Sequence, residues 1–292
     1  MLGLLGPALA ACGALGLSRP PVRVGSTNFA EQLILAELYA QILEGNGYRV
    51  DRKLDLGSRE VVAPALESGQ IDMYPEYLAT YTASVTRDPR KASSDPVETS
   101  KALQAALKPK GLRALDYAPA VNTNGFVVTQ ETAQRYDLRN VSDLARVNGQ
   151  LVFGGPPECP TRPFCLLGLQ LTYGLRFKDF KPLDAGGPRT VAALESGQVD
   201  VAELFTTDAA IQVKSFVLLA DDKHLQQADN VVPVVRDDLL ARAPNDFEPA
   251  VNGLTARVTT EELIGLNRQV GVDRRDPKEV ATAWLRRVET RR

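Results

Sequence analysis

The residues with the clearest binding chemistry are aromatic and hydroxyl side chains that follow apolar stretches of the chain. Tyr77 and Thr80 follow one such stretch, and Phe205 and Thr206 follow another. Ligands of α/β sheets gather where strands end, and an aromatic face at that place can hold an apolar or cationic group. Packing as ordinary core is the alternative for these aromatics. The residue types favour binding of a small molecule with a cationic or apolar part.

Catalytic chemistry has less support in the sequence. The sequence has no Gly-x-Ser-x-Gly motif and no Gly-rich phosphate loop. Its one histidine, His224, is interpreted as a surface loop residue, which leaves few options for a metal site or an imidazole base. An exported hydrolase that uses Glu76 or Asp208 remains the less favoured alternative. We therefore expect no enzyme, no metal and no cofactor.

The composition describes an ordinary globular protein. The 292 residues are 44% hydrophobic and 24% charged, which is enough for two compact domains. The net charge of −2 gives no basic field for nucleic acid, so DNA and RNA are not expected partners. The sensing half of a transcription regulator would need a helix-turn-helix segment, and an apolar segment occupies the N-terminal end.

A repeated octapeptide predicts how the chain is organised. Residues 65–72 recur as residues 193–200, with seven of eight positions identical. Each copy is typical of a helix end, a glycine stop and a short apolar strand that begins after an aspartate. A single recurrence at this long spacing indicates two α/β lobes of like construction. The predicted fold is therefore two-lobed α/β, with a ligand cleft between the lobes.

The first predicted strand leads Ser26 and Thr27 to the start of a helix. Asn28, with Glu31 three residues later, forms a capping-box pattern for a helix that runs to about Glu44. Hydroxyls and free backbone N–H groups at a helix N-terminus suit an anionic or polar ligand group. Plain helix capping is the alternative.

The remaining elements are predicted from apolar periodicity and turn residues. Ser58 is expected to cap a helix that ends at Gly69, and Pro75 to terminate the strand that begins at Ile71. Trp284 is expected to be a core residue of the last helix. The other predicted strands cover 22–26, 49–56, 112–117, 126–129, 150–154, 199–204 and 231–235, and helices cover 98–107, the region near 143, 166–173, 260–270 and 277–288.

Two irregular segments are expected to connect the lobes. Residues 119–125 have no regular period, and the chain is expected to cross back near residues 220–223. Lobe 1 is then predicted to comprise residues 22–121 and 223–292, and lobe 2 residues 122–222.

The N-terminus is predicted to be an export signal. Residues 2–11 are apolar but too few to span a bilayer, and residues 9–12 resemble a bacterial lipobox. In this interpretation residues 1–21 are signal and tether, and Cys12 carries lipid on the outer face of the plasma membrane. No Lys or Arg precedes the apolar run, which leaves two alternatives: a true start upstream of Met1, or an unprocessed apolar end.

Cys159 and Cys165 lie six residues apart and are predicted to form a disulfide, because an exported protein meets an oxidising compartment. A loop this short gains about 2 kcal/mol in the chain-entropy model, and less where two prolines already stiffen the segment. Its main expected effect is to hold Arg162 still. Two thiolates and one distant histidine make a poor zinc site.

Five blocks in order, at residues 25–32, 58–62, 74–77, 206–208 and 221–223, resemble one family. It is the glycine betaine, carnitine and choline binding proteins of bacterial ABC importers, of the ProX type. The resemblance runs from about Val22 to at least Leu240. It implies a two-lobed periplasmic-binding fold of type II that closes on its ligand and docks on a membrane permease.

The resemblance also implies roles for particular residues. The family surrounds a trimethylammonium group with tyrosines and holds the ligand carboxylate with Lys, Arg and Thr. Tyr77 matches a cage tyrosine, Thr80 the carboxylate-binding threonine and Arg162 the arginine.

Four positions depart from the family pattern. Thr27 stands where the family usually has Lys, and Asn124, Phe205 and Asp229 stand where it has Tyr. A cation over an aromatic face is worth about 0.5 to 2 kcal/mol, so two lost faces would weaken binding by on the order of 1 to 4 kcal/mol. The predicted ligand is a weakly bound betaine or another zwitterionic or aromatic compound. The candidate ligand-binding residues are Ser26, Thr27, Tyr77, Thr80, Asn124, Arg162, Phe205, Thr206 and Asp229.

Overall fold

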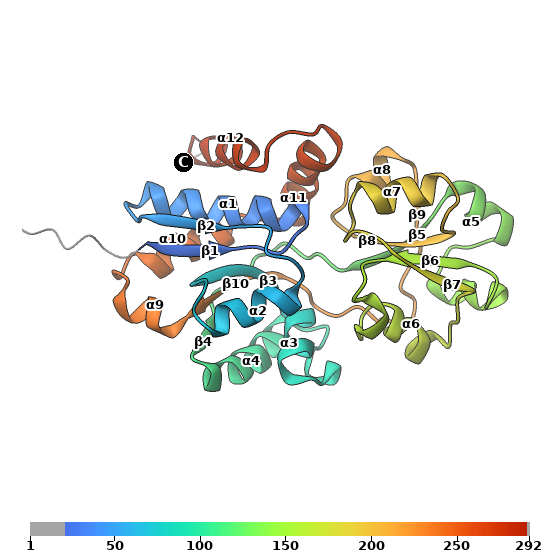
Figure 1. The fold of residues 1–292 in the computed structure, drawn as a ribbon, viewed down its shortest axis with the longest axis horizontal. Helices are drawn as coiled ribbons and strands as arrows, with labels where there is room; N and C mark the ends of the chain where they lie inside the picture. Colours follow the sequence, from blue (N-terminus) through green and yellow to red (C-terminus); the bar gives the residue numbers. More distant parts are fainter. Residues whose placement is uncertain (1–20, 291–292) are drawn as a thin grey trace, which may run out of the picture.

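The computed structural model describes residues 21–290, which form two α/β lobes, each built on a five-stranded sheet (Figure 1). The first sheet has the order β2-β1-β3-β10-β4, and the second has the order β7-β6-β8-β5-β9. The first contains β1 (Val22–Gly25), β2 (Val50–Lys53), β3 (Met73–Tyr77), β4 (Leu112–Ala114) and β10 (Val231–Arg236). The second contains β5 (Asn124–Val128), β6 (Val152–Gly155), β7 (Asp179–Pro182), β8 (Val201–Phe205) and β9 (Val217–Leu218).

The two sheets have the same topology. In the first, β1 is parallel to β2 and β3, and β10 joins antiparallel to β3. In the second, β6 is parallel to β7 and β8, and β5 joins antiparallel to β8. The predicted two-lobed α/β fold is confirmed.

Helices cover both faces of each sheet. Figure 1 shows α1 and α12 on one side of the first sheet and α2, α3 and α4 on the other, and a separate apolar core lies on each side. The second lobe also has two cores, one beside α6 and one beside α7. The helices are α1 (Ala30–Gly45), α2 (Arg59–Glu67), α3 (Leu78–Thr86), α4 (Pro96–Leu107), α5 (Gln130–Tyr136), α6 (Leu166–Tyr173), α7 (Pro188–Glu195), α8 (Ala210–Val213), α9 (Asp237–Arg242), α10 (Phe247–Thr255), α11 (Thr260–Asn267) and α12 (Pro277–Glu289).

The repeated octapeptide forms the same joint in both lobes. The glycines that follow α2 and α7, Gly69 and Gly197, have φ of 77° and 69°, as an αL helix end requires. The aspartate of each copy then fixes the first parallel strand of its lobe. Asp72 accepts a hydrogen bond from the backbone N–H of Arg23, and Asp200 accepts one from that of Val152, both at 2.8 Å. This joint confirms the predicted internal duplication.

Three local predictions are wrong. Ser58 lies at the N-cap of α2, but its hydroxyl donates to Glu60 and makes no cap hydrogen bond. The helix α1 begins at Ala30 with Phe29 at the N-cap and no side-chain cap, because the carboxylate of Glu31 is drawn into buried tertiary hydrogen bonds. Pro75 does not end its strand, since β3 continues to Tyr77. Pro75 lies opposite Pro233 of β10. Because proline has no backbone N–H, this pair leaves no donor of the sheet without an acceptor.

The C-terminal helices complete the first lobe. Trp284 of α12 is buried, as predicted, and packs in the core beside α1. Two short helices, α9 and α10, were not predicted. His224 is exposed in a loop, as predicted.

The predicted lipid attachment at Cys12 and nearly all of the predicted signal and tether, residues 1–21, lie outside the described residues. Between residues 21 and 290, no helix is long and apolar enough to cross a membrane.

Candidate ligand-binding site

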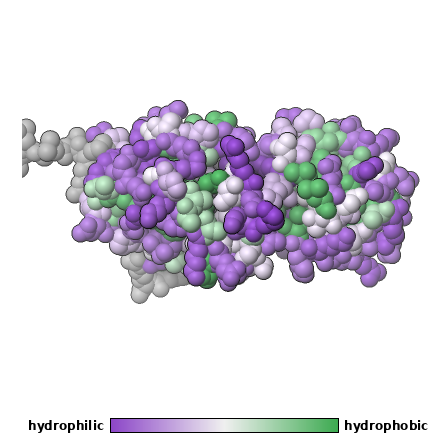
Figure 2. All heavy atoms as spheres, turned by 90° about the horizontal axis from the view of Figure 1, so that it is seen from below, coloured by the Kyte–Doolittle hydropathy of each residue, from purple (hydrophilic) through white to green (hydrophobic). Residues whose placement is uncertain are grey.

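A cavity of about 500 Å³ lies between the two lobes. Lobe 1 contributes the N-terminal end of α2, the end of β3 and the helix α3, and lobe 2 contributes the disulfide loop, α6 and the end of β8. Figure 2 views the molecule from below, where apolar residues are exposed on both lobes within a mostly hydrophilic surface. Leu171 of α6, which is 77% exposed, lines the cavity.

Aromatic side chains from both lobes line this cavity. The rings of Phe29 and Phe205 lie 4.6 Å apart between centroids, and Phe29 and Tyr77 lie 6.3 Å apart. Phe164 of the disulfide loop adds a fourth aromatic residue. Phe29 and Phe164 were missed by the sequence analysis, although Phe29 directly follows Asn28, the predicted cap of the first helix. The aromatic lining is therefore larger than the family pattern alone predicted.

A buried ion pair supports the lobe 1 wall. Arg59, at the start of α2, donates to both carboxylate oxygens of Glu76 at 2.6 and 2.7 Å. The same guanidinium donates to Thr80 Oγ1 at 2.7 Å, and Tyr74 donates to Glu76 at 2.9 Å. These bonds fix the hydroxyl of Thr80 at the surface of the cavity.

Asp229 places a carboxyl group in the same wall. Its Oδ1 accepts hydrogen bonds from the backbone N–H of Thr80 at 2.9 Å and from the Thr80 hydroxyl at 3.3 Å. Burial raises the pKa of Asp229 to about 7, although the Thr80 bonds and the charge of Arg59 lower it. A cation bound in the cavity would favour the ionised form of this carboxyl group.

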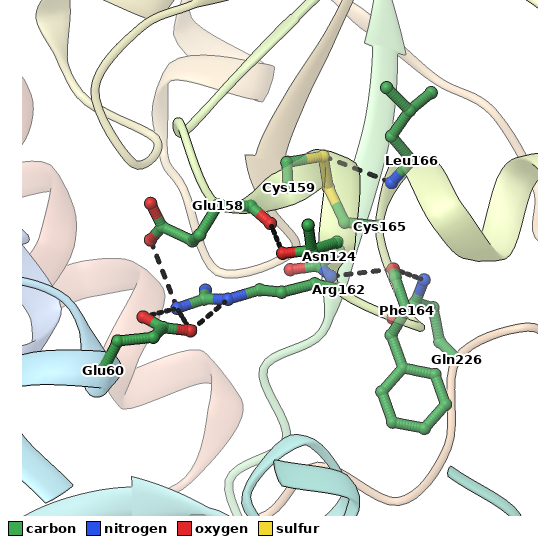
Figure 3. Close-up of a disulfide and its surroundings, with 10 residues drawn as sticks. Glu60, Asn124, Glu158, Cys159, Arg162, Phe164, Cys165, Leu166 and Gln226 are labelled. Carbon is green, nitrogen blue, oxygen red and sulfur yellow. Dashed lines mark hydrogen bonds and ion pairs between the residues drawn. A yellow bond between two sulfur atoms is a disulfide. The ribbon is translucent and has the colours of Figure 1, made fainter. Parts of the chain in front are cut away.

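The disulfide loop brings the arginine of lobe 2 to the cavity. Cys159 and Cys165 form the predicted disulfide (Figure 3). Arg162 between them pairs with Glu158 of its own loop at 3.2 Å and with Glu60 of α2 at 3.0 Å. The Glu60 pair joins the two lobes. Burial alone would raise the pKa of Glu60, but Arg162 and Ser58 hold it at about 2.

Asn124 and Gln226 hold the tip of the same loop. Their side-chain amides both donate to the backbone oxygen of Phe164 at 2.8 Å (Figure 3). Asn124 lies at the start of β5 and Gln226 in the segment that returns to lobe 1. The backbone at Phe164 is thus held by residues next to both connections between the lobes.

Six of the nine predicted site residues line the cavity: Tyr77, Thr80, Asn124, Arg162, Phe205 and Asp229. Thr27 lines a smaller adjoining cavity of about 40 Å³, and its buried Oγ1 has no hydrogen-bond partner among the described residues.

The other two predicted residues do not line the cavity. Ser26 is fully buried, and its hydroxyl accepts from the backbone N–H of Asp55. Thr206 exchanges hydrogen bonds with Thr123 of the crossing segment.

Glu31 forms a buried junction behind the aromatic wall. One carboxylate oxygen accepts from Tyr77 at 2.7 Å and from Asn122 at 2.8 Å. The other accepts from Thr207 and Asn267, both at 2.6 Å. These four donors come from β3, the crossing segment, lobe 2 and α11, so a single carboxylate ties the cavity wall to the boundary between the lobes.

The arrangement suits reversible binding of a small polar molecule. Aromatic faces from both lobes stand beside three arginines and two carboxyl groups that line the cavity, and the ligand would touch both lobes. Within residues 21–290, no three His, Cys, Asp or Glu side chains are grouped so that they could hold a metal ion.

Comparisons with known proteins agree with this geometry. Residues 20–287 match the family model described as the substrate-binding domain of ABC-type glycine betaine transport systems. A glycine-betaine-binding protein of Pseudomonas aeruginosa is 30% identical over 285 residues, which cover 94% of this chain and 90% of that protein. An ergothioneine transport permease/ergothioneine binding protein of Helicobacter pylori is 26% identical, covering 93% of this chain and 48% of that protein. A solved structure of a glycine betaine/carnitine/choline ABC transporter has a TM-score of 0.70 at 26% identity, covering 92% of this chain and 97% of that one.

Proposed function

Because this chain belongs to the family of substrate-binding domains of ABC-type glycine betaine transport systems, we propose that it binds a small quaternary-ammonium or zwitterionic osmoprotectant between its lobes. The bound ligand is delivered to the permease of an uptake transporter. Members of this family are extracytoplasmic solute-binding proteins of transporters, not enzymes.

The observation that supports this proposal is the aromatic lining of the cavity. Phe29 and Tyr77 belong to lobe 1, and Phe164 and Phe205 to lobe 2. A cation over an aromatic face gains about 0.5 to 2 kcal/mol. Phe29 and Phe164 can therefore offset the two aromatic faces that Asn124 and Asp229 lack. Glycine betaine, carnitine and choline all have the trimethylammonium group that such faces bind.

Binding between two lobes couples the ligand to closure. A ligand that touches aromatic faces of both lobes stabilises the closed arrangement by its differential contacts. A permease can then distinguish the loaded protein from the empty one by the position of the lobes. The limits that we propose for the lobes, to within a few residues, are 22–121 with 223–292 for lobe 1 and 122–222 for lobe 2.

A larger aromatic zwitterion is the alternative ligand within the same transport role. The relative from Helicobacter pylori is named for ergothioneine, and a cavity of about 500 Å³ lies within the range of ligand pockets for drug-sized molecules. The aromatic faces suit a ring as well as an ammonium group.

We also propose that the protein is held at the outer face of the plasma membrane by lipid on Cys12. The support is the lipobox-like tetrapeptide at residues 9–12 and the extracytoplasmic location of the family. In this proposal residues 1–21 are a signal and a tether.

Calorimetric titration tests the ligand class. The purified protein is titrated with glycine betaine, carnitine, choline and ergothioneine, and Phe205→Leu is compared with Phe247→Leu, a buried change in lobe 1 away from the cavity. Phe205→Leu is expected to weaken ammonium binding about two- to thirty-fold, and Phe247→Leu to leave the affinity unchanged. Absence of binding by all four compounds contradicts the proposal.

A further inference from the structure

The ion pair between Arg162 and Glu60 crosses the cavity between the lobes. Arg162 Nη2 lies 3.0 and 3.2 Å from the two carboxylate oxygens of Glu60, and Nε lies 3.4 Å from one of them. Arg162 belongs to the disulfide loop of lobe 2, and Glu60 to the first turn of α2 in lobe 1 (Figure 3). Both residues line the cavity.

A carboxylate of the protein thus occupies the face of Arg162 that a ligand carboxylate would use. Guanidinium groups bind carboxylates through neighbouring N–H donors, and Glu60 already takes the Nε and Nη2 donors. Glu158 approaches the same Nη2 at 3.2 Å. The charge of Arg162 is therefore compensated before any ligand arrives.

The other charges around the cavity do not restore a site for an anion. Arg59 is paired with both oxygens of Glu76, and Asp229 adds another carboxyl group to the same wall. Arg87 lies at the rim and is exposed, so solvent screens its charge. Thr27, which lines the adjoining cavity, has a neutral side chain and therefore adds no positive charge.

We propose that Glu60 is a specificity-determining residue: by pairing with Arg162, it keeps the Arg162 guanidinium from binding a ligand carboxylate. The site then favours ammonium ligands that lack a carboxylate over zwitterionic ones, and a zwitterion binds by displacing Glu60. This inference rests on the proposed function. It identifies the residue that decides whether the preferred ligand of that class carries a carboxylate.

The size of the effect follows from the exposure of the pair. The side chain of Glu60 is 55% exposed and that of Arg162 is 27% exposed, so solvent weakens their attraction. A hydrogen bond to a charged group in a drier site would correspond to about ten-fold or more in affinity. For this half-exposed pair we expect removal of Glu60 to change selectivity about three- to ten-fold.

Titration of the full chain with choline and glycine betaine tests the inference, because the two ligands share the ammonium group and differ in the carboxylate. In Glu60→Gln the affinity for glycine betaine relative to choline is expected to rise about three- to ten-fold. Glu67→Gln is the matched control, since it removes a like charge from the far end of the same helix, where Glu67 pairs with Lys110. The control is expected to keep the wild-type ratio.

A double-mutant comparison separates this role from a general effect on the fold. In an Arg162→Gln background, Glu60→Gln is expected to leave the ratio unchanged, because the guanidinium for which Glu60 and the ligand compete is gone. An unchanged or lowered ratio in Glu60→Gln alone overturns the inference.

The test also separates this inference from the proposed function. If the wild-type chain binds none of glycine betaine, carnitine, choline and ergothioneine, the proposed function fails. Glu60→Gln then decides the inference: binding of glycine betaine by this variant supports it, and no binding overturns it as well.

Discussion

The two lobes repeat one strand order, yet each stabilises its wall of the cavity differently. In lobe 1 the wall rests on a buried ion pair, with Arg59 12% and Glu76 2% exposed. In lobe 2 the wall rests on the disulfide between Cys159 and Cys165 and on two amides that bind the Phe164 carbonyl. The lobes should therefore respond to different perturbations.

The difference follows from the physical chemistry of each device. A buried ion pair stabilises only while both partners are present, because removal of one leaves an uncompensated charge. A short disulfide acts largely by restricting the unfolded chain and is insensitive to charge. Lobe 1 is thus sensitive to substitution of one side chain, and lobe 2 to reduction.

The third strands of the two sheets also differ in how they bury a carboxyl group. Glu76 of β3 receives hydrogen bonds from Arg59 and Tyr74. Glu203 of β8 is equally buried, but its Oε2 has no hydrogen-bond partner among the described residues. Burial raises the pKa of Glu203 to about 8, despite the opposing charge of Arg162. The first carboxyl group acts as an anion and the second as a neutral acid.

The largest expected effect is the loss of the lobe 1 anion. Glu76→Gln leaves Arg59 buried without its counter-charge and should lower the free energy of unfolding by about 3 to 5 kcal/mol. Glu203→Gln, which replaces a neutral acid by a neutral amide, should change it by less than about 1 kcal/mol at pH 7. Urea denaturation of both variants measures the difference, and equal losses would contradict the contrast between the two carboxyl groups.

Reduction should act on lobe 2 by a smaller amount. Loss of the disulfide, by reductant or by Cys159→Ser with Cys165→Ser, is expected to lower the free energy of unfolding by at most about 2 kcal/mol. The loss is smaller than for a flexible loop because Pro160 and Pro163 already stiffen the unfolded segment. Denaturation with and without reductant measures this cost. Glu76→Gln should lose the same further amount as the wild type on reduction, because its defect lies in the other lobe. A cost that disappears in Glu76→Gln would show that the two walls are not independent.

The pH dependence of the free energy of unfolding should reflect the protonated carboxyl group of Glu203 in lobe 2. Glu203 holds its proton more tightly in the folded state, since its folded pKa of about 8 lies above the ordinary value of 4.5. The stability that this proton contributes is fully present below pH 4.5 and is lost as pH rises towards 8, with a slope of up to about 1.4 kcal/mol per pH unit.

Two other carboxyl groups act in the same direction at lower pH. Burial raises the pKa of Asp229 to about 7 and that of Asp208 to about 6. The interval between pH 7 and 8 therefore reports mainly Glu203. Unfolding free energies at these two pH values are expected to differ less in Glu203→Gln than in the wild type. An unchanged difference would rule out Glu203 as its source.

The fold could be predicted because its signals are local. The glycines after α2 and α7, and the aspartates that follow, specify the same joint twice within eight residues. A duplicated joint is enough to indicate two lobes. Tyr77 and Phe205 could be predicted as candidates because each ends the corresponding strand of its sheet.

The remaining site residues depend on partners that are distant in the chain. Arg162 and Glu60 are 102 residues apart, and Glu31 and Asn267 are 236 apart. Local sequence instead assigned Glu31 to a capping box, which was wrong because four buried donors compete for its carboxylate. Phe164 lies in the disulfide loop and not at a strand end, and Phe29 follows the first strand but was assigned to the start of the first helix, so their place in the lining became visible only in three dimensions.

The smallest expected effect compares the two copies of the repeated joint. Alanine at Gly69 or Gly197 should cost about 1 kcal/mol, because each position has the φ of the left-handed region. A Cβ at Gly197 meets nothing within 4 Å, whereas one at Gly69 would lie 3.3 Å from the guanidinium of Arg236. That guanidinium donates to the backbone oxygens of Leu66 and Glu67.

We therefore expect Gly69→Ala to lose more stability than Gly197→Ala, by a few tenths of a kcal/mol. Thermal unfolding of both variants, each also made with Arg236→Ala, measures this difference. The gap should disappear without Arg236, because the crowding at Gly69 comes from that side chain alone. If the gap persists without Arg236, crowding by that side chain is not its cause. The two copies of the repeat would then differ in backbone stability although they make the same hydrogen bonds.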